Sequence, residues 1–182
     1  IHERLVGSEM CIRDRQITAA GVIAAAYAAI SLVLASITFG AVQCRVSEAL
    51  TLLPVLSPAA IWGVTLGCAI TNGVGAATGA NFLGMVDLFV GTAATLLAAV
   101  ASRLLGRIRI GRVPWLSALP PILFNAVAIG AEWCYAATGS INVAFWAFAG
   151  QIALGQLPPC LLGVWLIHLL ERRGLQNIIE GK

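Results

Sequence analysis

Apolar residues fill almost the whole stretch from Ile17 to Leu170, in runs long enough to cross a lipid bilayer. A membrane-spanning helix needs roughly 20 mainly apolar residues. Because backbone N–H and C=O groups find no water in lipid, such runs fold as helices or as closed barrels, and the alternating pattern of barrel strands is missing from this sequence. Charged residues make up only 10% of the chain, against about 25% in soluble domains. We therefore expect an all-α integral membrane protein.

The pattern predicts a six-helix bundle in which the second helix is short. This short apolar segment, residues 47–53, stops at Pro54. The other five helices are expected at residues 17–38, 58 to about 72–75, 85–105, 115–137 and 142–170. The glycine-rich stretch 73–84 is typical of a binding loop. Pro158 and Pro159 lie inside the last helix, and an internal proline removes a helical hydrogen bond, so we expect two half-helices that meet near Leu157.

The first fifteen residues differ from the rest, because they carry scattered charges without any membrane period. Their run SEMCIRDR resembles a translated sequencing-adaptor leader. We accordingly divide the chain into a non-native leader at 1–15, a membrane domain at 16–173 and a cytoplasmic tail at 174–182.

The basic residues predict the orientation. They precede the first helix, lie between the fourth and fifth helices, and follow the last one: Arg13, Arg15, Arg103, Arg107, Arg109, Arg112, Arg172, Arg173 and Lys182. If residues 47–53 count as a crossing, all of these fall on one side, and only Arg45 lies on the other. Basic residues gather on the cytoplasmic side of a membrane. We therefore expect a multi-pass protein of a prokaryotic plasma membrane with both termini in the cytoplasm.

Three carboxylates, Glu48, Asp87 and Glu132, interrupt the apolar runs. A charge at the bilayer centre costs at least ~2.5–3.5 kcal/mol, so each carboxylate needs a compensating partner. Together with nearby amides they form a set that suits a small ligand rich in hydrogen-bonding groups. The candidate binding residues are Arg45, Glu48, Asn72, Asp87, Asn125, Glu132 and Gln156.

Structural roles compete with this hypothesis. Arg45 and Glu48, three residues apart, would form a neutralising ion pair, a role about as probable as ligand contact. Asp87 lies at a helix start, where capping is the more probable single role. Asn125 and Gln156 would hydrogen-bond between helices. Glu132 has no oppositely charged neighbour in the sequence, which favours a functional role by about two to one.

Catalytic motifs are missing from the sequence. It has no GxxxxGK[ST] phosphate-binding loop and no HExxH metal motif, and its sole lysine is Lys182. The five cysteines are scattered, with no CxxC pair. We expect neither an enzyme nor a metal site, and no nucleic-acid binding, since the basic residues cluster at helix ends.

Four segments carry a family resemblance: FGAVQCRVSEALTLLP at 39–54, LGCAITN at 66–72, VDLFVGTAATLLAA at 86–99 and LPPILFNAVAIGAE at 119–132. They resemble the QueT family, the substrate-binding S components of energy-coupling factor (ECF) importers. The resemblance implies a six-helix S component for a queuosine precursor, a 7-deazaguanine such as preQ1. It also implies a membrane coupling subunit, EcfT, and two ATPases that use ATP, so this chain itself needs no cofactor. The small residues Ala20, Ala24 and Ala28 would dock on EcfT.

The resemblance also suggests roles at the site. Glu132 would bind the ring N–H and exocyclic amine, Asn125 or Asn72 the ring carbonyl, and Glu48 or Asp87 the ammonium of preQ1. Trp133, Phe82 or Trp62 would stack on the ring. Gln156 stands where the family has a glutamate, which suggests a less cationic precursor such as preQ0 or queuine. The alternatives are an S component for another vitamin-like solute, a small oligomeric transporter driven by protons through Glu132, and a purely structural membrane protein.

Overall fold

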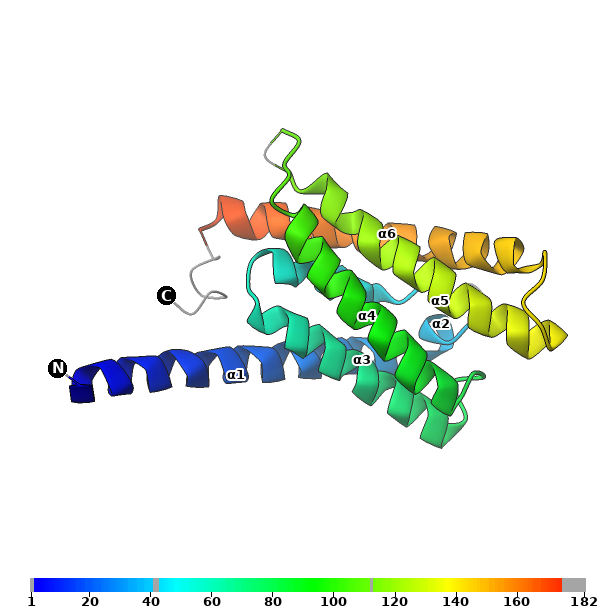
Figure 1. Ribbon diagram of the computed structural model, residues 1–182, viewed down its shortest axis with the longest axis horizontal. Coiled ribbons are helices and arrows are strands. Elements are labelled where there is room, and N and C mark those ends of the chain that lie inside the picture. The colour runs from blue at the N-terminus through cyan, green and yellow to red at the C-terminus, as the bar shows by residue number, and fades with distance from the viewer. Residues whose placement is uncertain (1, 41–42, 112, 175–182) are drawn as a thin grey trace.

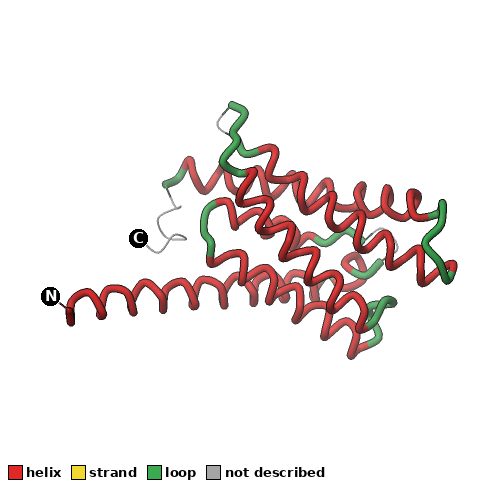
Figure 2. Tube along the Cα trace, viewed as in Figure 1, coloured by secondary structure: helices red, strands yellow, loops and turns green. Residues whose placement is uncertain are grey.

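The computed structural model describes residues 2–40, 43–111 and 113–174, and these fold almost entirely as helices (Figure 2). In chain order the elements are α1 (His2–Val33), α2 (Ala35–Thr38), η1 (Val46–Val55), α3 (Ala59–Thr78), α4 (Met85–Leu105), η2 (Trp115–Ala118), α5 (Leu119–Thr138) and α6 (Phe145–Arg172). Helix α1 begins at His2 and runs without a break through the expected leader.

Five segments are long and apolar enough to cross a membrane: Ile12–Val33, Ala59–Thr78, Met85–Leu105, Trp115–Thr138 and Phe145–Arg172. The shorter η1 is a 3₁₀ helix of 10 residues with Pro54 inside it. The expected all-α membrane bundle with a short second helix is confirmed.

Neighbouring helices pack in sequence order, α3 on α4, α4 on α5 and α5 on α6, while α1 lies against α3 (Figure 1). The short η1 contacts α1, α3, α4 and α6, so it lies inside the bundle. Its second half joins the main apolar core, where Leu52 and Leu53 pack with Val164 and Ile167 of α6. The first half of η1 carries the polar residues Ser47 and Glu48 instead, both 0% exposed.

The two ends of the bundle differ in charge. The start of α1, the end of α4 and the end of α6 share one end, on the left in Figure 1. Within that end, both Arg109 guanidinium nitrogens Nη1 and Nη2 donate to the Glu171 carboxylate at 2.6 Å, and this hydrogen bonding raises the pKa of Arg109 above its ordinary value. Helix α2 and the turn 79–84 lie at the opposite end, on the right in Figure 1. Arg112 and Lys182 fall outside the described residues.

Two expectations about helix boundaries are wrong. Helix α6 is continuous from Phe145 to Arg172 and contains Pro158 and Pro159, so there are no separate half-helices. It packs on both α5 and η1, and such packing keeps a proline-containing membrane helix in line despite its lost hydrogen bonds. Helix α3 continues to Thr78, so the first half of the expected glycine-rich loop is helical and residues 79–84 form the connection.

The small-residue stripe of α1 faces inward rather than toward a partner. Ala24 is 2% exposed and Ala28 7%, while Ala20 is half-buried. This face lies on α3, where a Cβ built at Gly67 would come 2.7 Å from Tyr27 Cβ and 3.0 Å from the Ala24 carbonyl oxygen. Close packing of α1 on α3 therefore covers Ala24 and Ala28, and of the three alanines expected to dock on a partner only Ala20 is partly exposed.

Replacing Gly67 with alanine is expected to destabilise the bundle by ~1–3 kcal/mol, because the added methyl group overlaps Tyr27 and the α1 backbone. Gly73→Ala on the same helix is the matched control, since the nearest atom of a neighbouring helix to a Cβ built there, Leu88 Cδ1, is 3.8 Å away. Thermal unfolding in detergent measures both. Equal melting temperatures for the two variants would contradict the close approach of α1 and α3.

Candidate ligand-binding site

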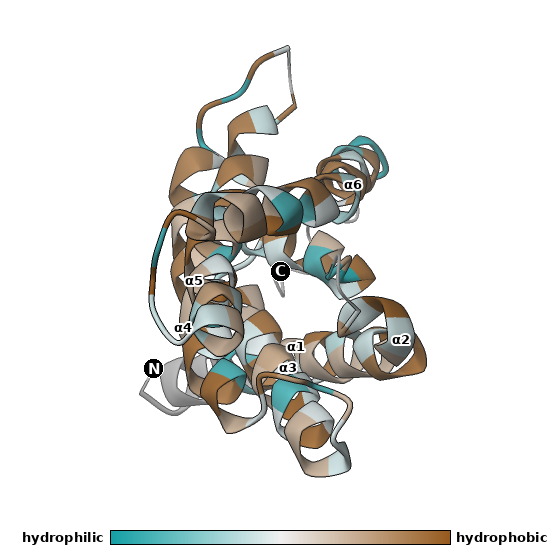
Figure 3. Cartoon of the chain, turned by 90° about the vertical axis from the view of Figure 1, so that its right-hand side faces the viewer, coloured by the Kyte–Doolittle hydropathy of each residue, from teal (hydrophilic) through white to brown (hydrophobic). Residues whose placement is uncertain are grey.

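Six of the seven candidate residues are buried in the bundle. Their exposed fractions do not exceed 4%: Arg45, Glu48, Asn72, Asp87, Asn125 and Gln156. They come from the start of η1 and the connection before it, and from α3, α4, α5 and α6. Figure 3 looks onto the bundle from the end opposite the basic one, and teal hydrophilic positions are visible there among mainly brown helices. The sequence therefore identified a set of buried polar groups, which differ in their partners.

Arg45 pairs with Asp87 rather than with Glu48. Its Nη2 donates to Asp87 Oδ2 at 2.9 Å, and its Nη1 donates to the Cys68 sulfur at 3.7 Å. The guanidinium carbon also lies 5.7 Å from the centre of the Phe39 ring. The expected Arg45–Glu48 ion pair is thus wrong, because the partner is supplied by α4, 42 residues further along the chain.

Asp87 does not cap helix α4. The N-cap residue is Gly84, and no side-chain capping bond forms there. Instead Asp87 Oδ2 accepts hydrogen bonds from Arg45 and from the Asn81 side chain, the latter at 2.7 Å. Its charge is consequently compensated inside the protein, and its capacity to bind a further cation is reduced.

Asn72 joins α3 to α4. Its Nδ2 donates to the Asp87 backbone oxygen at 3.0 Å and to the Cys68 sulfur at 3.5 Å. Gly91 on α4 makes room for this contact, since a Cβ there would overlap Asp87 Oδ1 and come 2.9 Å from Asn72 Nδ2. The donor of Asn72 is therefore in use, while its oxygen finds no hydrogen-bond partner in the described part of the chain.

Glu48 is held by a residue that the sequence analysis missed. The Tyr27 hydroxyl, 0% exposed on α1, donates to Glu48 Oε1 at 2.8 Å. The Asn125 side chain of α5 also lies near this carboxylate. Glu48 Oε2 is buried and has no partner among the residues described. The sequence feature that could have identified Tyr27 is a polar aromatic residue beside the small residues of α1.

Tyr27→Phe is expected to weaken binding of a cationic ligand at Glu48 by roughly tenfold. The change removes one hydrogen bond to a charged group, and such bonds contribute ~1.5–3 kcal/mol. Calorimetric titration of the detergent-purified protein measures the affinity. Thr65→Val is the control, because the Thr65 hydroxyl donates within its own helix, to the Ile61 backbone oxygen at 2.7 Å. An unchanged affinity in Tyr27→Phe would mean that Tyr27 does not orient Glu48 for binding.

Glu132 differs from the other carboxylates, because both of its oxygens are buried without a hydrogen-bond partner in the described structure. It lines a cavity of about 540 Å³ between α4 and α5, with Val86 and Val90 among the apolar residues around it. Glu132 and Asn125, seven residues apart on α5, are thus in different surroundings. The absence of a compensating partner around Glu132 favours the functional role.

An aromatic stack stands beside Glu132. The Trp133 ring lies between Phe82 and Phe148, with centroid distances of 5.5 and 6.4 Å and interplanar angles of 23° and 25°. Trp133 Nε1 is buried and unpaired within the part of the chain that is described. Trp62 lies elsewhere, in a groove with Arg13 and Gln16 near the basic end. Of the three aromatic candidates, only Trp133 and Phe82 are close to the polar residues.

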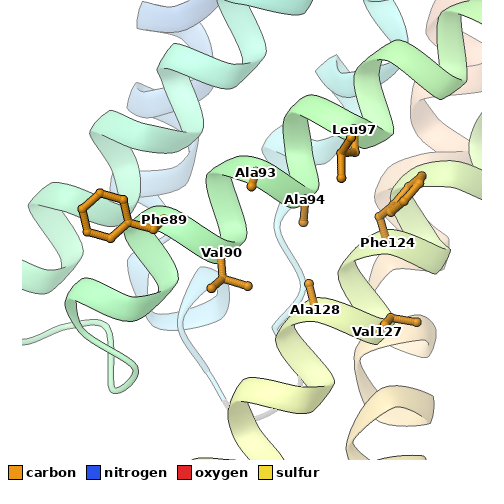
Figure 4. A pocket seen from close by; sticks show the side chains of 8 residues that line it. All are labelled: Phe89, Val90, Ala93, Ala94, Leu97, Phe124, Val127 and Ala128. Carbon is orange, nitrogen blue, oxygen red and sulfur yellow. The ribbon is translucent and has the colours of Figure 1, made fainter.

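A second cavity, of about 390 Å³, adjoins the first between α4 and α5 (Figure 4). It shares Val90, Val127 and Ala128 with the Glu132 cavity. All of its lining side chains are apolar, with Phe89 and Leu97 from α4 and Phe124 from α5 among them. It supplies no group that could orient a polar ligand.

Gln156 is the site residue with the fewest defined contacts. It is 2% exposed on α6, and its Oε1 has no hydrogen-bond partner in the described ranges. The sequence suggested that Gln156 takes part in a hydrogen bond between helices. Its side-chain oxygen accepts no such bond in the described ranges.

Comparison with known proteins identifies one family. A family model described as QueT transporter matches residues 17–172. Neither a curated protein nor a solved structure matches the chain.

Proposed function

The chain belongs to the QueT transporter family, and from this premise we propose that it binds a cationic 7-deazaguanine, preQ1, as the S component of an ECF importer. Its apolar helices and the family together make it a multi-pass membrane protein with a role in transport. The observation that carries the proposal is the set of unpaired polar atoms in the bundle.

These atoms are mainly hydrogen-bond acceptors. Oxygens without a partner among the described residues belong to Glu48, Asn72, Asp87, Thr92, Glu132 and Gln156, whereas the unpaired nitrogen donors are Arg45 Nε and Trp133 Nε1. Buried polar groups are nearly always hydrogen-bonded, so a fitting ligand supplies mostly donors. The ring N–H groups, exocyclic amine and ammonium of preQ1 provide such donors.

The charge balance favours the same ligand. Three buried or partly buried carboxylates face one guanidinium, and Asp87 alone forms an ion pair with it. Glu48 and Glu132 have no ion-pair partner within the described chain. A buried charge is stable only when it is paired. This balance favours a cationic precursor over neutral preQ0, despite the glutamine at position 156.

The contacts also narrow the roles of individual residues. We assign the ring N–H and exocyclic amine to Glu132, beside the stacking ring of Trp133. The ammonium is assigned to Glu48 rather than Asp87, because Arg45 and Asn81 already occupy Asp87 Oδ2. Asn125 is better suited than Asn72 to meet the ring carbonyl, because Asn72 Nδ2 already donates to α4.

Calorimetric titration of the detergent-purified chain tests the proposal. We expect binding of preQ1, weaker binding of preQ0, which has a nitrile in place of the ammonium, and no binding of riboflavin. Equal affinity for preQ1 and preQ0 would contradict the assignment of Glu48 to the ammonium. No binding of any 7-deazaguanine would contradict the proposed substrate class.

For energy coupling, we propose EcfT and two ATPases as partners, with the basic end in the cytoplasm. With Ala24 and Ala28 buried, three of the small residues that α1 exposes, Gly21, Ala25 and Ala29, are spaced by four on one face. Such faces allow close helix contact in lipid. Ala25→Trp is expected to leave preQ1 binding unchanged and to stop ATP-dependent uptake in cells that contain the partners. Undiminished uptake would exclude this face as the docking surface.

One observation favours a second candidate function. The two unpaired oxygens of Glu132 also suit a carboxyl group that carries a proton. The chain would then act as a proton-driven transporter. Uptake that persists without the coupling subunits and stops when the proton gradient collapses would support this alternative.

A further inference from the structure

One carboxylate oxygen is shared by two separate connections of the chain. Asp87 Oδ2 accepts from Arg45 Nη2 at 2.9 Å, at the end of the connection that leads into η1. It also accepts from Asn81 Nδ2 at 2.7 Å, in the turn between α3 and α4. Asn81 is 4% exposed and Arg45 3%.

The Asn81 side chain also organises its own turn. Its Oδ1 accepts from the Leu83 backbone N–H at 3.1 Å, and its backbone N–H donates to the Gly75 oxygen at 3.0 Å. Gly79 and Gly84 bound the turn with positive φ angles of 72° and 62°, which glycine adopts without steric cost. The turn is thus fixed to α3 by the backbone and to α4 by the Asn81 amide.

We propose that Asn81 is a positioning residue of the ligand site and that it holds Arg45 in place through Asp87. Loss of the Asn81 amide should therefore loosen both the turn 79–84 and the segment that ends at Arg45. Without the Asn81 donor, Asp87 Oδ2 loses one of its two hydrogen bonds, and the carboxylate is free to turn away from Arg45. Arg45 precedes Glu48 by three residues. The clasp of Arg45, Asp87 and Asn81 therefore fixes the start of η1, where Glu48 projects.

Asn142 provides a matched control. Its Oδ1 accepts from the Ala144 backbone N–H at 2.9 Å, which is the same turn geometry as at Asn81. Its Nδ2 donates to the Thr138 hydroxyl at the end of α5 at 3.0 Å rather than to a carboxylate. Substitution by aspartate at either position retains the side-chain oxygen that accepts the backbone N–H of the turn. Only Asn81→Asp also places an oxygen against Asp87.

Hydrogen–deuterium exchange of the purified protein without ligand tests the clasp. Loss of a hydrogen bond to a charged group is expected to speed exchange about tenfold or more. In Asn81→Asp this should occur both at 79–84 and at 43–48, whereas Asn142→Asp should affect only its own turn. Faster exchange confined to 79–84 would overturn the inference. Should Asn81→Asp not fold, Asn81→Ser applies the same criterion, since its hydroxyl is too short to reach Asp87.

The consequence for binding rests on the proposed function and is measured separately. With preQ1 as the probe, Asn81→Asp should bind about tenfold more weakly than wild type, mainly through faster dissociation, and Asn142→Asp should bind normally. If the wild-type protein binds no 7-deazaguanine but Asn81→Asp exchanges faster at both 79–84 and 43–48, the proposed function is contradicted and the clasp is supported. Normal preQ1 binding with exchange confined to the turn would contradict the clasp alone.

Discussion

Glu132→Gln is expected to lower the affinity for preQ1 at least about a hundredfold while leaving the protein folded. The carboxylate is assigned two charge-assisted hydrogen bonds with the ring N–H and the exocyclic amine, and each such bond contributes ~1.5–3 kcal/mol. Glutamine has nearly the same shape but no charge, and its amide N–H₂ group would face a donor of the ligand. Calorimetric titration in detergent measures the change.

Glu171→Gln is the control for this prediction. Glu171 is a carboxylate at the basic end that pairs with Arg109, so its loss should leave ligand affinity unchanged. Thermal unfolding of Glu132→Gln should show no loss of stability, because neither oxygen of Glu132 has a hydrogen-bond partner in the described structure to lose. Affinity in Glu132→Gln within about threefold of wild type would exclude Glu132 as the ring contact.

The second large effect concerns stability. Arg45→Met or Asp87→Leu alone is expected to destabilise the protein by ~3–5 kcal/mol, because each change leaves an uncompensated buried charge. The double variant should be more stable than either single one, since no charge then remains unpaired at this position. Unfolding of all four proteins in detergent forms a double-mutant cycle. Additive losses would show that the pair contributes no coupling energy.

The helices could be predicted from the sequence because membrane spans depend on local composition. The expected helix at 85–105 matches α4, which runs from Met85 to Leu105. The continuity of α6 could not be predicted, because it depends on packing against α5 and η1 rather than on Pro158 and Pro159 alone. Likewise, alanine spacing in α1 indicated a packing face but not which helix it meets.

The residues of the site could be predicted more easily than their partners. A charge within an apolar run is conspicuous whatever lies around it, so Glu48, Asp87 and Glu132 were identifiable. Their contacts join segments far apart in the chain: Tyr27 meets Glu48 across 21 residues, and Arg45 meets Asp87 across 42. A local pattern contains no information on such pairs. Asn81 was missed because a lone asparagine in a glycine-rich turn is ordinary.

Because η1 is a 3₁₀ helix, it is longer than an α-helix with the same number of residues. A 3₁₀ helix rises about 2.0 Å per residue, against 1.5 Å for an α-helix. The 10 residues of η1 therefore extend about 20 Å, where an α-helix of equal length would extend about 15 Å. Side chains three apart also line up along it, so Glu48, Thr51 and Pro54 form one row. If Val55 stayed in place, rewinding this segment as an α-helix would move Glu48, seven residues away, by about 3.5 Å along the helix axis and turn that row away from its present neighbours.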